Sequence, residues 1–250
     1  MSFSGQSPFQ NIPPVVKNLI IINAIMLLAS YVIGSSSSID INLNRVLGLY
    51  YFESSQFKPF QLISHIFMHG GIAHLFFNMF ALFMFGRVLE QVWGSKRFFI
   101  YYFFTGIGAA LLHTFVLYLE AKSIMANLSP EQIALVKAEG TSIYLQGKNY
   151  MDQGMAALNL LLNIPTVGAS GAVFGVLLAF GMYFPNTVLM LIFPPIPIKA
   201  KYFVMIYGGI ELYLGFTQSN SNIAHFAHLG GMLFGFILIK IWAKRRDRFY

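Results

Sequence analysis

Long apolar segments constrain this chain more than any other feature of its sequence. A helix needs about 20 largely apolar residues to cross the hydrocarbon core of a bilayer, and it satisfies its own backbone hydrogen bonds there. Only 10% of the residues are charged, against about 25% in a soluble domain. The sequence therefore predicts an all-α membrane protein with one six-helix domain over residues 15–243. Its expected spans are residues 15–34, 62–86, 97–119, 169–184, 200–217 and 223–243.

Basic residues concentrate on one side of the predicted domain. With the N-terminus inside, the cytoplasmic side carries most of the 16 Lys and Arg residues, while the outer side is nearly balanced by acids. This asymmetry follows the positive-inside rule. We therefore expect a short cytoplasmic N-terminal segment, residues 1–14, and a basic cytoplasmic tail, residues 244–250. The outer loops are expected at about 35–60 and 120–157.

The location of this charge also limits the partners. Because the basic residues border membrane spans, they are expected to contact lipid headgroups, and no soluble basic face remains for nucleic acid. The first span begins too late and runs too long for a cleavable signal peptide, so it is expected to be retained. No transit peptide is expected before it. We therefore expect a multi-pass protein of the bacterial inner (plasma) membrane.

The second outer loop contains a helix signal. In the stretch "SPEQIALVKAEG", Ser129 is placed to cap a helix and Pro130 to begin it, while Gly140 is placed to end it. The sequence thus predicts a short surface helix here.

Polar residues crowd the start of the second span, in "SHIFMHGGIAHLFFNMF". His74 and Asn78 are four residues apart and share one helix face, while Gly70 and Gly71 weaken the helix before them. Polar side chains at bilayer depth normally face the protein interior or a wet cavity. Two donors on one inward face could stabilise a developing negative charge; they could also simply join helices.

The fourth span begins with Ser170, a candidate reactive serine. In "IPTVGASGAVFG", Ser170 stands at the start of a short helix, close to free amides and the positive end of the dipole. Gly168 and Gly171 leave room for a substrate backbone. The alternative is a serine that merely caps its helix. The stretch is also not the G-x-S-x-G elbow of soluble hydrolases, because position 172 is Ala.

A stripe of His and Gly residues runs along one face of the sixth span, in "NIAHFAHLGGMLFGF". Gly231 and Gly235 make a small-xxx-small seam that lets another helix approach closely, and Gly171 and Gly175 offer a matching seam. Two helices packed in this way could bring His228 within hydrogen-bond reach of Ser170. That pair would be a nucleophile with its general base.

Taken together, these motifs resemble the rhomboid family of intramembrane serine proteases. The resemblance runs from the second span to the sixth and rests on "HIFMHGGIAHLFFN", "GASGAVFG" and "AHFAHLGG" in that order. It implies a six-helix rhomboid-like bundle with both termini cytoplasmic, which cleaves transmembrane segments of other proteins. The implied site is a Ser170–His228 dyad without a catalytic acid. Its implied surroundings are an oxyanion hole of His74, Asn78 and the Ser170 amide, with His69 and Gly231 as structural residues.

The chain departs from the family pattern at two places. Many members carry a Trp-Arg pair in the first outer loop, where this chain has Phe60 and Gln61. Some members have a Tyr that packs on the catalytic His, where this chain has Phe174. Neither change removes a group that the family mechanism needs. "LEQVWGS", with Glu90 and Gly94, resembles the cytoplasmic turn of the family after the second span.

Two other classes stay open on the sequence. One is a non-catalytic rhomboid-like protein that binds membrane clients. The other is a metal or haem protein ligated by facing histidine pairs, His65 with His69 and His225 with His228. The chain has no Cys and no H-E-x-x-H, so neither a metal nor another cofactor is expected. Glu211 lies within the fifth span without an assigned role, and we expect it near the outer end of its helix, facing water, rather than in the active site.

Overall fold

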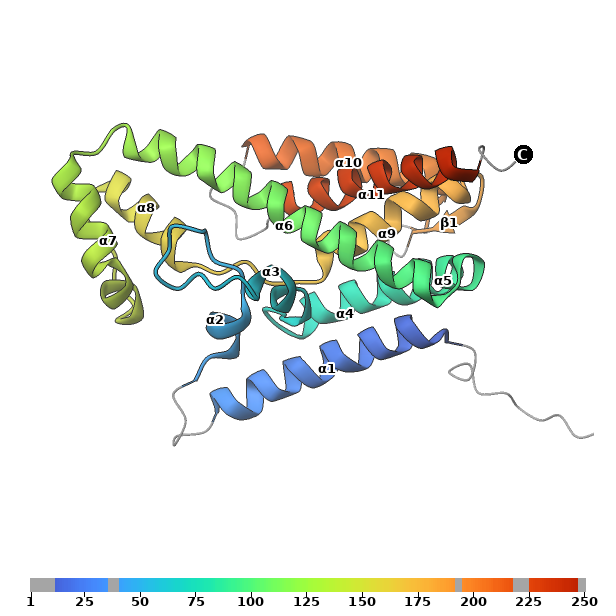
Figure 1. Ribbon diagram of the computed structural model, residues 1–250, viewed down its shortest axis with the longest axis horizontal. Coiled ribbons are helices and arrows are strands. Elements are labelled where there is room, and N and C mark those ends of the chain that lie inside the picture. The colour runs from blue at the N-terminus through green and yellow to red at the C-terminus, as the bar shows by residue number, and fades with distance from the viewer. Residues whose placement is uncertain (1–11, 36–40, 192–194, 218–224, 247–250) are drawn as a thin grey trace, which may run out of the picture.

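The computed structural model describes residues 12–35, 41–191, 195–217 and 225–246. It is almost entirely helical (Figure 1). Four helical stretches are long and apolar enough to cross a membrane: Pro14–Gly34, Ile72–Trp93, Ser95–Met125 and His225–Lys244. Two shorter helices, α9 (Ser170–Tyr183) and α10 (Ala200–Thr217), occupy the remaining predicted spans. Each predicted span therefore contains helix, although by length and composition four described stretches qualify as membrane spans.

The second span begins later than predicted. Residues 62–71 are not part of it: they form a single turn, α3 (Gln61–Ser64), a 3₁₀ turn, η1 (His65–Phe67), and an extended approach to Gly71. The continuous helix starts at Ile72 and consists of α4 (Ile72–Ala81), a π-helical turn η2 (Leu82–Gly86) and α5 (Arg87–Trp93). The Gly70-Gly71 pair, which costs helix stability, lies at this break. His65 and His69 consequently precede the helix that carries His74 and Asn78.

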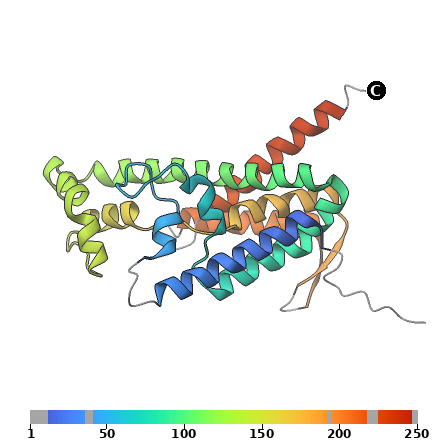
Figure 2. The same ribbon diagram turned by 60° about the horizontal axis from the view of Figure 1, so that its bottom comes forward.

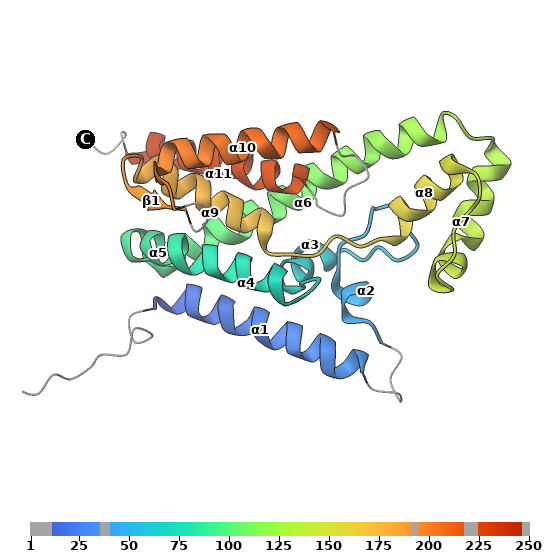
Figure 3. The ribbon, with the colours of Figure 1, turned by 180° about the vertical axis from the view of Figure 1, so that it is seen from behind.

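Three helices form the centre of the bundle. α6 (Ser95–Met125), α9 and α11 (His225–Arg246) pack on one another, and α10 lies against α9 and α11 (Figures 1 and 3). α1 (Pro14–Gly34) covers the opposite side of the 72–93 stretch. The second view shows α11 extending past the other helices toward the C-terminus (Figure 2). α9 is buried along nearly its whole length, as a helix that is apolar on every face should be.

The two segments predicted as outer loops fold into short helices toward one end of the bundle (Figure 1). These helices are α2 (Leu43–Leu47), α7 (Pro130–Leu145) and α8 (Gln153–Asn163). The predicted cap is confirmed: Ser129 and Gln132 form a reciprocal capping box, with Pro130 at the first turn. The predicted end at Gly140 is wrong, because α7 continues to Leu145. Gly140 instead lies against Asn159 of α8, where a Cβ would overlap the amide oxygen.

A short hairpin that the sequence did not predict joins α9 to α10. β1 (Val188–Met190) pairs antiparallel with β2 (Pro197–Lys199), with Leu189 opposite Ile198. Pro197 begins its strand, a position where the missing amide hydrogen costs no central ladder bond.

A buried carboxylate fixes the first helix. Glu90 is 2% exposed and accepts hydrogen bonds from the amides of Val15 and Val16 at 2.9 and 2.8 Å, and from the Ser95 hydroxyl at 2.7 Å. The positive end of the α1 dipole favours a negative charge at this position. Glu90 thus holds α1 against the 72–93 stretch, and the turn at Gly94, whose φ is +77°, precedes the Ser95 hydroxyl that also bonds to Glu90.

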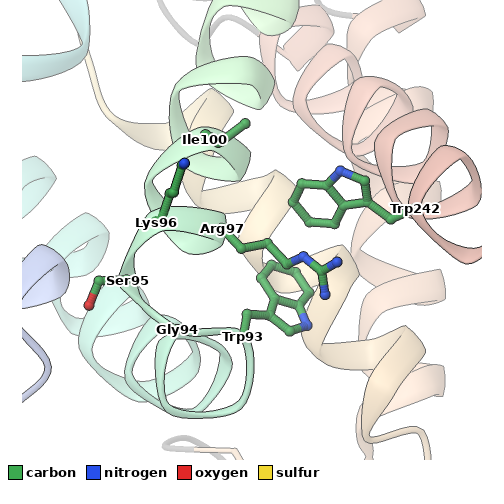
Figure 4. Close-up of a pocket in the computed structure, with 7 residues that line it drawn as sticks. All are labelled: Trp93, Gly94, Ser95, Lys96, Arg97, Ile100 and Trp242. Carbon is green, nitrogen blue, oxygen red and sulfur yellow. The ribbon is translucent and has the colours of Figure 1, made fainter. Parts of the chain in front are cut away.

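One pocket of about 410 Å³ lies where α5, α6 and α11 meet (Figure 4). The Arg97 guanidinium stacks over the Trp242 ring in its wall, 4.8 Å from the ring centre. None of the predicted site residues lines this pocket. Its lining consists of Trp93, Gly94, Ser95, Lys96, Arg97, Ile100 and Trp242.

Candidate active site

Ser170 is the first residue of α9 and follows a segment without helical structure. Contacts with three other residues hold that segment in place. Thr166 and Leu49 exchange two backbone hydrogen bonds of 2.8 Å each, and the Thr166 hydroxyl lies 2.8 Å from His113 Nε2. The Gly168 amide donates to the His65 carbonyl at 3.0 Å. The backbone that leads to Ser170 is therefore fixed by Leu49 after α2, by His65 of η1 and by His113 of α6, rather than by its own secondary structure.

Ser170 and His228 lie within hydrogen-bond distance of each other. The Ser170 Oγ atom is 2.9 Å from His228 Nε2, and the two residues are 58 apart in sequence. The helices meet through glycine: a Cβ on Gly231 would overlap the carbonyl oxygen of Gly171. Close approach of α9 and α11 at these glycines thus brings the hydroxyl and the imidazole together.

The ring of Phe174 packs against one face of the His228 ring. The two rings stack with centroids 4.2 Å apart and planes 4° from parallel. Phe174 lies one turn after Ser170, so the same face of α9 carries both the hydroxyl and the ring that limits the movement of His228. This stacking uses the Phe174 ring alone and needs no hydroxyl on it.

Glu211 lies in the same cluster, which corrects our expectation for it. Its carboxylate is buried, with 5% of the residue exposed, and does not face water at the end of a helix. Glu211 Oε2 lies 2.9 Å from His228 Nδ1 and 2.7 Å from His225 Nδ1. An ionised carboxylate only accepts hydrogen bonds. With Glu211 ionised, both imidazoles carry hydrogen on Nδ1, and His228 Nε2 is then the acceptor for the Ser170 hydroxyl.

His74 lies beside Gly168. The Gly70 amide donates to His74 Nδ1 at 3.3 Å, so the hydrogen of the neutral ring is on Nε2. A Cβ added to Gly168 would come within 3.0 Å of that Nε2 atom and within 3.5 Å of Ser170 Oγ. Gly168 also has φ +135°, a backbone conformation that favours glycine. A ring N–H donor thus adjoins the serine, and Gly168 lets the backbone pass close to both.

Asn78 is buried one turn further along α4. Its side-chain amide donates to the His74 carbonyl oxygen at 2.9 Å. The second amide hydrogen remains for another acceptor. His69 is also buried and meets the His74 ring edge-on, with centroids 5.0 Å apart.

The structure does not assemble the facing histidine pairs of the metal or haem hypothesis. Among the described residues, the one group of possible ligands is Glu211, His225 and His228, whose candidate ligand atoms lie within 4.8 Å of one another. His65 is not part of it, since its Nδ1 donates to the Gln61 carbonyl at 2.8 Å. His225 and His228 on α11 are thus joined by Glu211 from α10, and not by His65 and His69.

Gln61 organises the segment that the sequence predicts as the first outer loop. Its side chain is 1% exposed. The amide nitrogen donates to the carbonyls of Val46 and Gln56 at 3.2 and 3.1 Å, and the amide oxygen accepts from the Lys58 amide at 3.0 Å. Phe60 is half exposed. Gln61 therefore fastens three segments of this loop from inside.

Sequence reasoning left two side chains out of this site: it placed Glu211 outside the active site, and it did not name His113. Each is a titratable residue inside a strongly apolar segment, and such residues are expected to be functional. That signal was available for both. No periodicity could connect them to Ser170, because Glu211 and His228 lie on different helices and His113 is 53 residues from Thr166.

Comparison with known proteins places these features in a family. The Rhomboid domain model matches residues 56–245. The chain is 27% identical to the rhomboid homologue YdcA of Bacillus subtilis (strain 168) over 76% of this chain and 70% of that protein. It is 28% identical to RHOMBOID-like protein 12, mitochondrial, of Arabidopsis thaliana over 94% of this chain and 60% of that protein. It is 28% identical to Rhomboid protease GluP of Bacillus subtilis (strain 168) over 73% of this chain, which spans 26% of that relative.

Proposed function

This chain belongs to the rhomboid family of integral membrane proteins, and on that premise we propose that it is a serine endopeptidase that cleaves transmembrane segments of other proteins. The observation that carries the proposal is the 2.9 Å distance between Ser170 Oγ and His228 Nε2 at the start of a buried helix. A nucleophile with its base in hydrogen-bond reach is the signature of covalent catalysis. Names of relatives such as Rhomboid protease GluP agree with it.

The proposed reaction passes through an acyl-enzyme. His228 Nε2 takes the proton of Ser170 as the oxygen attacks the scissile carbonyl, and then gives that proton to the leaving nitrogen. Water hydrolyses the ester in a second step. The Ser170 amide at the α9 N-terminus, His74 Nε2 and the Asn78 amide would donate to the tetrahedral oxygen. Gly168 would leave room for the substrate backbone beside them.

Removing one oxyanion donor gives the first quantitative prediction. Asn78→Ala should lower kcat by about 10²- to 10³-fold, because a donor directed at the developing charge is lost. Asn23→Ala is the matched control: Asn23 is also buried and donates to the carbonyl four residues back, at 2.7 Å. Steady-state cleavage of a reconstituted transmembrane substrate measures both. Equal losses in the two variants would remove Asn78 from the proposed oxyanion hole.

Substrates are proposed to enter sideways, past α10. The apolar side chains of α10 that are most exposed include Met205, Tyr213 and Phe216, so this helix presents a surface suited to lipid or to another apolar helix. The loop near 214–222, expected above the entrance, lies largely outside the described residues, which stop at 217 and resume at 225. A helix must unwind locally before its peptide bond can be attacked, and cavity water is needed for the second step.

The proposed topology has six crossings with both termini in the cytoplasm of a bacterium. It is supported by the basic residues at the 72–93 and 95–125 turn and at the end of α11. Residues 1–11 and 247–250, the ends of the proposed cytoplasmic segments, lie outside the described residues. The proposed protease domain covers residues 15–243, and no cofactor enters its mechanism.

Covalent labelling tests the proposed activity without a known substrate. A fluorophosphonate probe should react with the purified wild-type protein in detergent, and peptide mass spectrometry should locate the adduct on Ser170. Ser170→Ala should abolish the labelling, whereas Ser142→Ala, on the exposed face of α7, should leave it unchanged. A folded wild-type protein that takes up no probe would refute the protease and favour a non-catalytic rhomboid-like protein that binds membrane clients.

A further inference from the structure

We propose that Glu211 is the positioning residue for His228, so that this rhomboid operates a Ser170–His228–Glu211 triad rather than a dyad. The inference rests on the proposed protease function and deepens it. Its basis is a chain of short contacts: Ser170 Oγ to His228 Nε2 at 2.9 Å, and His228 Nδ1 to Glu211 Oε2 at 2.9 Å. The acid belongs to α10, and the other two residues belong to α9 and α11.

The burial of Glu211 argues for a function. An acidic side chain inside the membrane domain is costly unless it is paired and hydrogen-bonded. Glu211 is 5% exposed, and His225, its second partner, is 4% exposed. Apolar side chains could join the two helices without the desolvation cost of three buried titratable groups. The arrangement is explained if the carboxylate serves the reaction.

The carboxylate acts on His228 in two ways. It accepts the Nδ1 hydrogen and so fixes the tautomer in which Nε2 carries the lone pair facing Ser170. It also lies next to the imidazolium that forms when the Ser170 proton moves to Nε2, and its charge stabilises that cation. The proton goes from Ser170 Oγ to His228 Nε2 and then to the leaving nitrogen as the C–N bond breaks. Glu211 itself stays ionised throughout.

His225 holds the carboxylate in place. Its Nδ1 lies 2.7 Å from the oxygen that His228 also contacts, and the two imidazole planes are 89° apart. Two donors arriving at one oxygen from different directions restrict the rotamer of Glu211. Phe174 restricts His228 from the other side by stacking. The imidazole is thus oriented by an acid at one nitrogen and by a ring at its face.

The test separates positioning from general destabilisation through kcat, KM and thermal unfolding of the full-length protein in detergent. Glu211→Gln removes the charge and places an amide where an acceptor is needed, so kcat should fall by between about 10²- and 10⁴-fold, while KM changes by less than about 2-fold. Glu211→Asp keeps the charge and should recover at least about 10-fold of that loss. The matched control is Glu90→Gln, a buried acid that holds α1: it should lower the melting temperature and leave kcat within about 2-fold.

Several results would overturn the proposal. Glu211→Gln with wild-type kcat would show that the acid does not act on His228. A kcat loss that Glu211→Asp fails to reduce would mean that the side chain only fills space, and this comparison holds even if the Gln variant folds poorly. Wild-type activity that EDTA abolishes and Zn²⁺ restores would identify the Glu211, His225 and His228 group as a metal site instead. A wild-type protein that fluorophosphonate does not label would refute the protease itself, whereas labelled wild type with an indifferent Glu211→Gln refutes only the triad.

Discussion

His228→Ala should turn over a transmembrane substrate at least about 10⁴-fold more slowly than the wild-type protein, and Ser170→Ala should be slowed as much. In hydrolases whose nucleophile and base act as one unit, removing either costs about as much as removing both. The 2.9 Å contact between the two side chains makes the same behaviour expected here. The residual rate would come from binding and the oxyanion donors.

The double variant provides the decisive comparison. Ser170→Ala with His228→Ala should be no slower than either single variant, because each has already disabled the same step. If the two residues contributed independently, the rate loss of the double variant would instead be the product of the two single losses. Single-turnover cleavage in proteoliposomes measures the three rates, and thermal unfolding checks that each variant is folded. A His228→Ala variant that keeps more than about 1% of the wild-type rate would exclude His228 as the base.

Gly231→Ala is expected to have the second large effect, through packing rather than chemistry. A Cβ at Gly231 would overlap the Gly171 carbonyl oxygen, which belongs to the backbone of α9 and cannot rotate away. The two helices must separate locally by about 1 Å to relieve this overlap, at a cost of about 1–3 kcal/mol of folding free energy. Because the same contact sets the distance from Ser170 to His228, the rate of fluorophosphonate labelling should fall together with the melting temperature.

Gly209→Ala is the matched control for this substitution. Gly209 lies in α10, and a Cβ there would have no atom within 4 Å. A glycine-to-alanine change at an open helical position removes backbone freedom from the unfolded chain and is neutral or slightly stabilising. Gly209→Ala should therefore retain both the melting temperature and the labelling rate. If both glycine variants behave alike, the close contact between α9 and α11 does not set the catalytic distance.

The order of these effects follows from what each residue does. In the proposed mechanism Ser170 and His228 carry the bond-making steps, so their loss should remove the activity. Glu211 and Asn78 act on those steps through a proton and a developing charge, so their loss reduces the rate by smaller factors. Gly231 acts by geometry alone, and its effect on rate is coupled to stability. Measuring kcat and melting temperature for every variant separates the three kinds of contribution.

The sequence by itself determined the helical class, the membrane environment and the family. Apolar segments long enough to cross a bilayer must satisfy their own backbone hydrogen bonds there, and an α-helix does so. The motifs around His74, Ser170 and His228 identify a rhomboid. It also determined local features that depend on neighbours in the chain, such as the Ser129 cap. It did not determine where the second span begins or that Gly140 leaves α7 unbroken, because Gly140 is placed by its contact with Asn159 on another helix.

Only the tertiary structure decided where the Glu211 side chain lies. An acid in the fifth span can face water, lipid headgroups or the interior, and the sequence carries no measure of the distance from Glu211 to two histidines on another helix. The fold brings them within hydrogen-bond distance because α10 packs against α11. A local pattern fixes helices and caps through contacts a few residues apart. A catalytic constellation depends on contacts between residues far apart in the chain, which packing alone creates.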